Sequence, residues 1–215
     1  MINRSVNLFI ALFVIIVISI ETYMYWFHRF QPWQPASPIG RMVFYYSFFT
    51  VLSNIMLAVS CAVLACKPTC DRTWFNVIRL NGIVGVMITM LVYNVMLRGI
   101  HKPPSLLLAF ANESLHVVIP LLGLLTWLLY GPFMRINLKV VSYVFLSLLG
   151  YGLYIFIRGH LTGQYPYPFI NVNRIGYEKS LMTAGMVAML FFILVMLLAV
   201  IERIRIKLSH SAQYR

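Results

Sequence analysis

Charged residues are scarce in this chain, and acidic residues are the scarcest. Only 10% of the 215 residues are charged, with 5 Asp and Glu against 17 Lys and Arg, whereas about 25% is usual in a soluble domain. So few charges exclude a water-exposed surface of ordinary composition, and hydrocarbon is the alternative solvent. The net charge of +12 does not indicate nucleic-acid binding, because the basic residues stand singly or in small groups between apolar runs. We interpret them as topology signals and contacts with lipid headgroups.

Cysteine and intramembrane histidine are also too few for a metal or redox centre. Cys61, Cys66 and Cys70 form no Cys-x-x-Cys pair and have no histidine near them, so no metal-ligand set is expected. A haem-bearing electron carrier would need a pair of axial histidines inside the membrane. Only His116 falls within an apolar run. The sequence therefore predicts no metal and no cofactor.

Long apolar runs are what the chain has in abundance, and 61% of its residues are hydrophobic. Each run is long enough, or nearly so, to cross a core of about 30 Å as a helix rising about 1.5 Å per residue. The runs are continuous rather than alternating, which favours helices over a barrel. The first run is too long for a signal peptide and no cleavage site follows it, so we interpret it as a retained helix. We predict an all-α fold, a polytopic membrane helix bundle with about six transmembrane helices, forming a single integral membrane domain over residues 1–215. The helices are expected at approximately 6–27, 42–66, 77–97, 114–130, 140–157 and 181–201.

Loop charges predict the orientation in the membrane. One side would hold both termini with the loops 67–79 and 131–139, and it carries ten of the 17 Lys and Arg; the other side carries the remaining seven. This excess predicts cytoplasmic termini. The linkers 28–41 and 158–179 then face outward, and both are rich in Pro and in the aromatic residues that suit the headgroup layer. The ten are Arg4, Lys67, Arg72, Arg79, Arg135, Lys139, Arg203, Arg205, Lys207 and Arg215, and the seven are Arg29, Arg41, Arg98, Lys102, Arg158, Arg174 and Lys179.

Polar residues inside the predicted helices gather in one half of the membrane. Polar groups in hydrocarbon are costly, so a cluster of them indicates a function or a tight network. Alternating helices bring these residues together in the outer half, which predicts a polar pocket opening toward the outer leaflet. In the second helix, spacings of three and four place Ser47, Thr50 and Asn54 on one face. The others are Ser19, Glu21, Thr22, Ser53, Thr89, Tyr93, Asn94, Asn112, Glu113, His116, Tyr151, Tyr154, Arg158, Ser180 and Thr183.

Two of these residues form a possible nucleophile and base. A hydroxyl nucleophile needs a base, and histidine is the usual one because its pKa lies near neutrality. Thr50 and His116 are the candidate pair. A third group would orient the imidazole, and either Asn112 or Glu113 can do so by spacing. Ser53 and Asn54 are candidate donors to an oxyanion. Each polar residue also has a plainer explanation: Ser and Thr often bond their own helix backbone, and Asn54 can bridge two helices.

Four stretches of the chain form a recognisable pattern: Phe48-Phe-Thr-Val-Leu-Ser-Asn, Leu115-His-Val-Val-Ile-Pro, Trp127-Leu-Leu-Tyr-Gly-Pro, and Arg158-Gly through Tyr165-Pro-Tyr-Pro-Phe-Ile-Asn to Gly176-Tyr. In these stretches the sequence resembles the androgen-induced-gene family of multipass membrane proteins, especially its bacterial six-helix branch. That family's animal members are threonine hydrolases that cleave fatty acid esters of hydroxy fatty acids with one Thr and one His in the membrane. The resemblance implies the same roles for Thr50 and His116.

Two functions follow from these expectations. The first is an intramembrane hydrolase that cleaves a fatty-acyl ester of a membrane lipid, with Thr50 as the catalytic nucleophile and His116 as the base. The second is a non-enzymatic membrane protein that carries or binds a lipid or small molecule. A polar pocket with an apolar floor fits both, and only the first needs Thr50 and His116 to touch.

Overall fold

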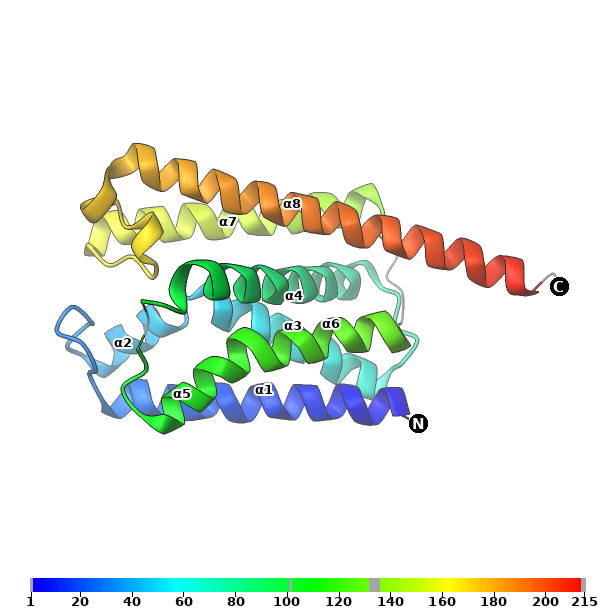
Figure 1. Ribbon diagram of the computed structural model, residues 1–215, viewed down its shortest axis with the longest axis horizontal. Coiled ribbons are helices and arrows are strands. Elements are labelled where there is room, and N and C mark those ends of the chain that lie inside the picture. Colours follow the sequence, from blue (N-terminus) through cyan, green and yellow to red (C-terminus); the bar gives the residue numbers. More distant parts are fainter. Residues whose placement is uncertain (1, 101, 132–135, 214–215) are drawn as a thin grey trace.

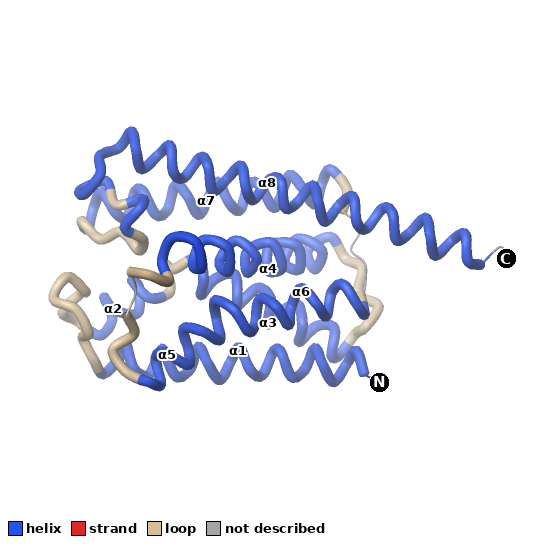
Figure 2. Tube along the Cα trace, viewed as in Figure 1, coloured by secondary structure: helices blue, strands red, loops and turns tan. Residues whose placement is uncertain are grey.

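The computed structural model describes residues 2–100, 102–131 and 136–213. Within these ranges the chain is built of helices joined by loops, with no strand (Figures 1 and 2). The predicted all-α membrane bundle is confirmed. Arg135 and Arg215, which entered the orientation argument, lie outside the described residues.

Six helical spans are long and apolar enough to cross a membrane among the residues described. An even number of spans returns the chain to its starting side, and the two termini lie at the same end of the molecule (Figure 1). The segments are α1 (Ile2–Phe27), α2 (Pro38–Tyr45), α3 (Phe49–Cys66), α4 (Thr73–Val92) with the π-helical turn η1 (Tyr93–Leu97), α5 (Leu106–Glu113), the π-helical turn η2 (Ser114–Val118), α6 (Ile119–Tyr130), α7 (Leu138–Thr162), the 3₁₀ turn η3 (Pro168–Ile170) and α8 (Val172–Gln213), which is broken at Gly176.

The bundle has one apolar core and an apolar exterior. Buried side chains such as Ile10 of α1, Leu57 of α3 and Ile83 of α4 are fully enclosed. The outer faces are equally apolar, because large hydrophobic side chains at helical spacing point away from the bundle along α1 and α8. In water such surfaces would aggregate, whereas lipid tails solvate them. The chain is therefore an integral membrane protein. The exposed residues include Leu8, Leu12 and Ile15 of α1 and Met182, Met186 and Met189 of α8.

The helix predicted over 42–66 is interrupted, which corrects the sequence-based expectation. Residues 38–45 form α2 and α3 starts again at Phe49, with Phe48 extended at φ −68° and ψ 131° between them. Ser47 lies in this break, and its hydroxyl donates to the Val43 carbonyl at 2.5 Å. The prediction that Ser47 shares a helical face with Thr50 and Asn54 is therefore wrong. The break places Thr50 at the second residue of a helix.

The five other predicted helices start later or end earlier than the observed ones. The fourth was expected over 114–130 but begins at Leu106, so His116 lies about 15 Å along it rather than at its entrance. The start of α3 at Phe49 and the early start of α5 at Leu106 bring Thr50 and His116 to the same depth. The remaining differences are extensions at the helix ends, where polar residues in the first and last turns interrupt the apolar pattern on which the prediction was based. The expected helices were 6–27, 77–97, 140–157 and 181–201. The observed helices are Ile2–Phe27, Thr73–Leu97, Leu138–Thr162 and Val172–Leu208.

A buried arginine fixes the loop end of the first two helices. The Arg41 guanidinium donates to the carbonyls of Tyr25 and Trp26 at the C-terminus of α1, at 2.7 and 2.6 Å, and to that of Ala36 at 2.6 Å. The last carbonyls of a helix have no intrahelical partner and carry partial negative charge, so a cation there is favourable. Arg41 therefore ties α2 to α1 at the end of the bundle that holds the polar residues.

Candidate functional site

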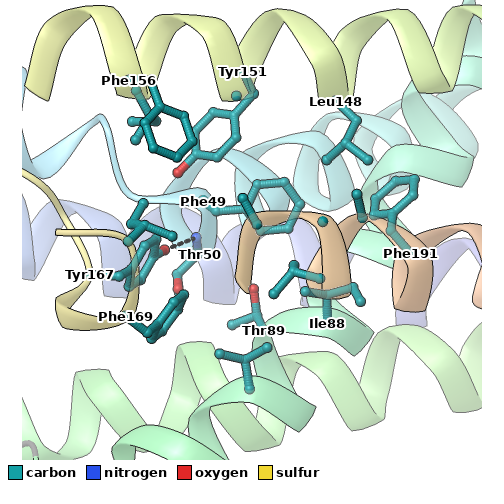
Figure 3. Close-up of a pocket in the computed structure, with 18 of the residues that line it drawn as sticks. Phe49, Thr50, Ile88, Thr89, Leu148, Tyr151, Phe156, Tyr167, Phe169 and Phe191 are labelled. Atoms are coloured by element: carbon teal, nitrogen blue, oxygen red, sulfur yellow. Dashed lines mark hydrogen bonds between the residues drawn. The ribbon is translucent and has the colours of Figure 1, made fainter. Parts of the chain in front are cut away.

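Thr50 lies at the start of α3, where backbone N–H groups have no helical partner. The N-cap residue is Phe48, whose side chain makes no capping hydrogen bond. The first-turn N–H groups therefore depend on other partners. The N–H of Thr50 donates to the hydroxyl of Tyr167 at 3.4 Å (Figure 3). The Thr50 side chain is buried, with 6% of its surface exposed. The candidate nucleophile and a backbone donor thus belong to the same residue.

His116 lies in the middle of the π-helical turn η2, with its imidazole directed at Thr50. The Thr50 Oγ1 and His116 Nε2 atoms are 3.3 Å apart. On the other side of the ring, Nδ1 lies 2.8 Å from the Asn112 carbonyl oxygen. A carbonyl oxygen can only accept, so Nδ1 carries the proton and, in the neutral imidazole, Nε2 offers its lone pair to the Thr50 hydroxyl. The predicted contact is therefore present with the tautomer that a base requires.

The orienting group is the backbone of Asn112 rather than a carboxylate. The Glu113 carboxylate pairs with Arg98 at 2.8 Å, and both side chains are nearly half exposed, at 45% and 46%. The side-chain amide of Asn112 donates to the Tyr93 hydroxyl at 2.7 Å. Of the two residues that sequence spacing left open, Asn112 holds the imidazole, and it does so through its carbonyl. Single π-helical turns are frequent at functional sites because they redirect backbone groups in this way.

Tyr93 supports the imidazole from the facing helix. It opens the second π-helical turn, η1, and its ring lies 4.3 Å from that of His116, inclined by 31°. Its hydroxyl accepts from Asn112 and donates to Glu113 at 3.3 Å. The two π-helical turns therefore face each other across the site, each carrying one of the two rings in contact.

Asn54 and Ser53 do not serve as oxyanion donors, which corrects that expectation. The Asn54 amide nitrogen donates to the Thr50 carbonyl at 2.8 Å and to the Leu115 carbonyl at 3.2 Å. The Ser53 hydroxyl donates to the Thr50 carbonyl at 3.1 Å. Both residues are fully buried. The Asn54 hydrogens go to backbone carbonyls, and the Ser53 hydroxyl also lies 3.3 Å from the hydroxyl of Thr89, so its hydrogen bonds are made within the bundle. Asn54 instead ties α3 to the turn that carries His116.

Other polar residues predicted for this half pair with one another around the loop end. Tyr45 donates to Glu21 at 2.9 Å, and the hydroxyls of Ser47 and Tyr154 lie 2.8 Å apart. Tyr151 donates to the Ser47 carbonyl at 3.1 Å. The alternation of the spans brings these groups together, as the sequence predicted, and the hydrogen bonds satisfy groups that are costly in hydrocarbon.

Two cavities meet at Thr50 and His116. The first, of about 570 Å³, lies between α4, α7 and α8 and is lined almost wholly by apolar side chains such as Leu148, Phe156 and Phe191 (Figure 3). The second, of about 660 Å³, opens toward the loops and includes polar and charged groups. Cavities of this size hold a lipid chain or a drug-sized ligand. The residues common to both are Thr50, Tyr93, Leu97, His116 and Tyr167.

Tyr167 is the site residue that sequence analysis missed. It lies in the Tyr-Pro-Tyr-Pro stretch of the linker 158–179, which we assigned to the headgroup layer, and it reaches back over the start of α3. Burial raises the pKa of Tyr167 above its ordinary value, although the facing hydroxyl and N–H of Thr50 oppose the shift. The residue is therefore a neutral phenol at physiological pH. The signal available in the sequence was the resemblance motif itself, which contains this tyrosine.

Comparison with known protein families, with curated proteins and with solved structures finds no match for this chain. Among the described residues, no three His, Cys, Asp or Glu side chains lie close enough to hold a metal ion. The chemistry of the site follows from its own geometry. The site combines a hydroxyl, an imidazole directed at that hydroxyl, a phenol, and one apolar and one polar cavity.

Proposed function

We propose that this protein is an intramembrane hydrolase that cleaves a fatty-acyl ester, with Thr50 as the nucleophile and His116 as the general base. The observation that carries the proposal is the 3.3 Å approach of Thr50 Oγ1 to His116 Nε2 at the junction of the two cavities. The resemblance to the androgen-induced-gene family supports the same two residues. The substrate would be a membrane lipid, and cytoplasmic termini would place the polar cavity at the outer leaflet.

The geometry fits an acyl-transfer sequence. Thr50 Oγ1 attacks the ester carbonyl while its proton passes to His116 Nε2, and the carbonyl π electrons move onto oxygen. Collapse of the tetrahedral intermediate breaks the bond to the alcohol, which takes the proton from His116 and leaves an acyl-threonine. Water then attacks the acyl carbon while its proton passes to His116, the bond to Thr50 Oγ1 breaks, and Oγ1 takes that proton back from His116, which releases the fatty acid and restores Thr50. The apolar cavity would hold the acyl chain, and the polar cavity would admit the alcohol portion and water.

Purified protein in detergent, given a fluorogenic medium-chain acyl ester, tests the proposal. Thr50→Val keeps the branched shape and removes only the hydroxyl, so turnover should fall by about 10³-fold or more. Thr50→Ser should retain measurable activity, because serine also supplies a hydroxyl. His116→Ala should cost a similar factor, and the double variant little more than either single one, because nucleophile and base act as a unit.

Covalent labelling provides an independent measurement. A fluorophosphonate probe should label the wild-type protein and spare Thr50→Val, with thermal unfolding of both proteins verifying that they are folded. Full activity in Thr50→Val would refute the mechanism.

A second function, lipid binding or carriage without catalysis, is favoured by one observation. The apolar cavity of about 570 Å³ is large enough for an acyl chain whether or not chemistry follows. A wild-type protein that binds fatty-acyl lipids with a defined stoichiometry but hydrolyses no ester over a range of chain lengths would establish this alternative.

A further inference from the structure

The proposed reaction develops a negative charge for which no donor has yet been identified. When Thr50 attacks an ester, the carbonyl oxygen becomes an oxyanion in a water-poor site, and preorganised donors there contribute more to the rate than in water. The Asn54 amide directs its hydrogens at backbone carbonyls, and the Ser53 hydroxyl pairs with the Thr50 carbonyl and the Thr89 hydroxyl. The donors must therefore come from elsewhere around Thr50.

Two groups are placed for this task. They are the Thr50 N–H, at the start of α3, and the Tyr167 hydroxyl. The Thr50 nitrogen and the Tyr167 hydroxyl oxygen are 3.4 Å apart, so the hydrogen bond that this N–H donates to Tyr167 is a long one. Two donors at that separation can both reach one oxygen at about 2.9 Å from each. The Thr50 N–H also belongs to the attacking residue, so any carbonyl within reach of its Oγ1 lies near this N–H. Tyr167 lines both cavities and so meets a substrate that spans them.

The loop that carries Tyr167 is fastened to α7. The Arg158 guanidinium donates to the Gln164 carbonyl at 2.9 Å. Gly159 lies against the ring of Tyr165, where an added Cβ would come within 2.1 Å of a ring carbon. The Tyr167 ring stacks on Phe169 at 5.2 Å and meets the edge of Phe48 at 5.5 Å. The phenol is therefore held in position before a substrate arrives, which is what preorganised stabilisation requires.

We propose that the Tyr167 hydroxyl and the Thr50 N–H form the oxyanion hole of this site, which makes Tyr167 a third catalytic residue. This inference rests on the proposed ester hydrolysis. As Thr50 Oγ1 bonds to the carbonyl carbon, the electron pair of the C=O π bond moves to oxygen. That oxygen accepts one hydrogen bond from the Tyr167 hydroxyl and one from the Thr50 N–H, which exchanges its long bond to the Tyr167 oxygen for this one. The phenol keeps its proton, and the bonds weaken when the carbonyl re-forms and the alcohol leaves.

Tyr167→Phe tests the inference, because it removes one oxygen atom and keeps the ring. We expect kcat for the fluorogenic ester to fall by about 10²- to 10³-fold, the usual cost of one oxyanion donor, with thermal unfolding unchanged. Labelling by the fluorophosphonate probe should slow by a similar factor, because the phosphoryl oxygen uses the same donors. Tyr154→Phe is the matched control. The Tyr154 phenol lies near the end of α7 that leads into the Tyr167 loop, but it bonds to Ser47 outside both cavities. The kcat of this variant should stay within about twofold of wild type.

Binding of the ether analogue of the fluorogenic ester separates an effect on catalysis from an effect on structure, since an ether has no carbonyl to develop charge. Tyr167→Phe should bind this analogue as tightly as the wild-type protein does. Weakened ether binding that accounts for the whole loss of activity would overturn the inference, because Tyr167 would then only shape the cavity. Full ester turnover in Tyr167→Phe, with Thr50→Val inactive, would overturn the inference and leave the hydrolase standing. A wild-type protein no more active than Thr50→Val would overturn both.

Discussion

At the scale of single residues, neighbours in the sequence have unequal parts in the site. Asn112 and Glu113 are adjacent, yet the Asn112 carbonyl holds His116 while the Glu113 carboxylate turns to Arg98. An ion pair exposed to this degree contributes about 0–1 kcal/mol. Its loss should therefore affect the reaction little.

Glu113→Gln provides a direct prediction at this scale. The side-chain carbonyl of Gln can still accept from Tyr93, and the charge that is lost is paired with Arg98 rather than with the imidazole. Turnover of the fluorogenic ester should stay within about twofold of wild type, since exposed pairs are worth so little. A fall comparable with that of His116→Ala would show that the carboxylate, not the Asn112 carbonyl, orients the base.

At the scale of helices, the position of Thr50 depends on how closely α3 and α4 approach. A Cβ built on Gly82 would lie 2.7 Å from the backbone nitrogen of Leu57, so only glycine allows this contact. Gly85 packs in the same way against Ser53, near Thr50, where a Cβ would come within 2.6 Å of the Ser53 Cβ. Small residues let backbones approach closely inside membranes.

Gly82→Ala should destabilise the protein, because the two backbones must separate to make room. Overpacking of this kind costs about 1–3 kcal/mol, so thermal unfolding in detergent should move to lower temperature. Gly150→Ala on α7 is the matched control, since a Cβ there has nothing within 4 Å, and a helical Gly→Ala change should be neutral or stabilising by up to about 1 kcal/mol. Equal unfolding temperatures for the two variants would contradict the importance of this contact.

At the scale of the whole molecule, the orientation in the membrane decides which leaflet the polar cavity serves. Ala36 is exposed and lies in the connection between α1 and α2, whereas Cys70 lies in the connection between α3 and α4. The second connection is at the same end of the molecule as the termini, and the first is at the opposite end (Figure 1). The excess of Lys and Arg predicts that this terminal end is cytoplasmic.

Labelling of intact cells with a membrane-impermeant maleimide tests the orientation. In Ala36→Cys on a Cys66→Ser, Cys70→Ser background, the reagent should label the new cysteine without permeabilisation. The parent protein should be labelled at Cys66 and Cys70 only after the membrane is opened. The opposite pattern would invert the topology and turn the polar cavity toward the cytoplasm, with its residues unchanged.

The sequence by itself determined the solvent and the helical fold, and it named Thr50 and His116 as a candidate pair. Continuous apolar runs can only satisfy their backbone groups in lipid as helices, and alternating helices must bring polar ends of the same side together. Those signals are local and periodic, so they can be recognised in the amino-acid sequence alone. The catalytic roles of the two residues stay predictions.

Tertiary structure decided the rest. The break at residues 46–48, the π-helical turn at His116 and the choice of the Asn112 carbonyl over the Glu113 carboxylate all depend on which helices pack against them, because they trade one backbone partner for another at little cost. The loop that carries Tyr167 has no periodicity to indicate which ring turns inward. Only the folded chain, in which residues more than a hundred positions apart meet, places that phenol over Thr50.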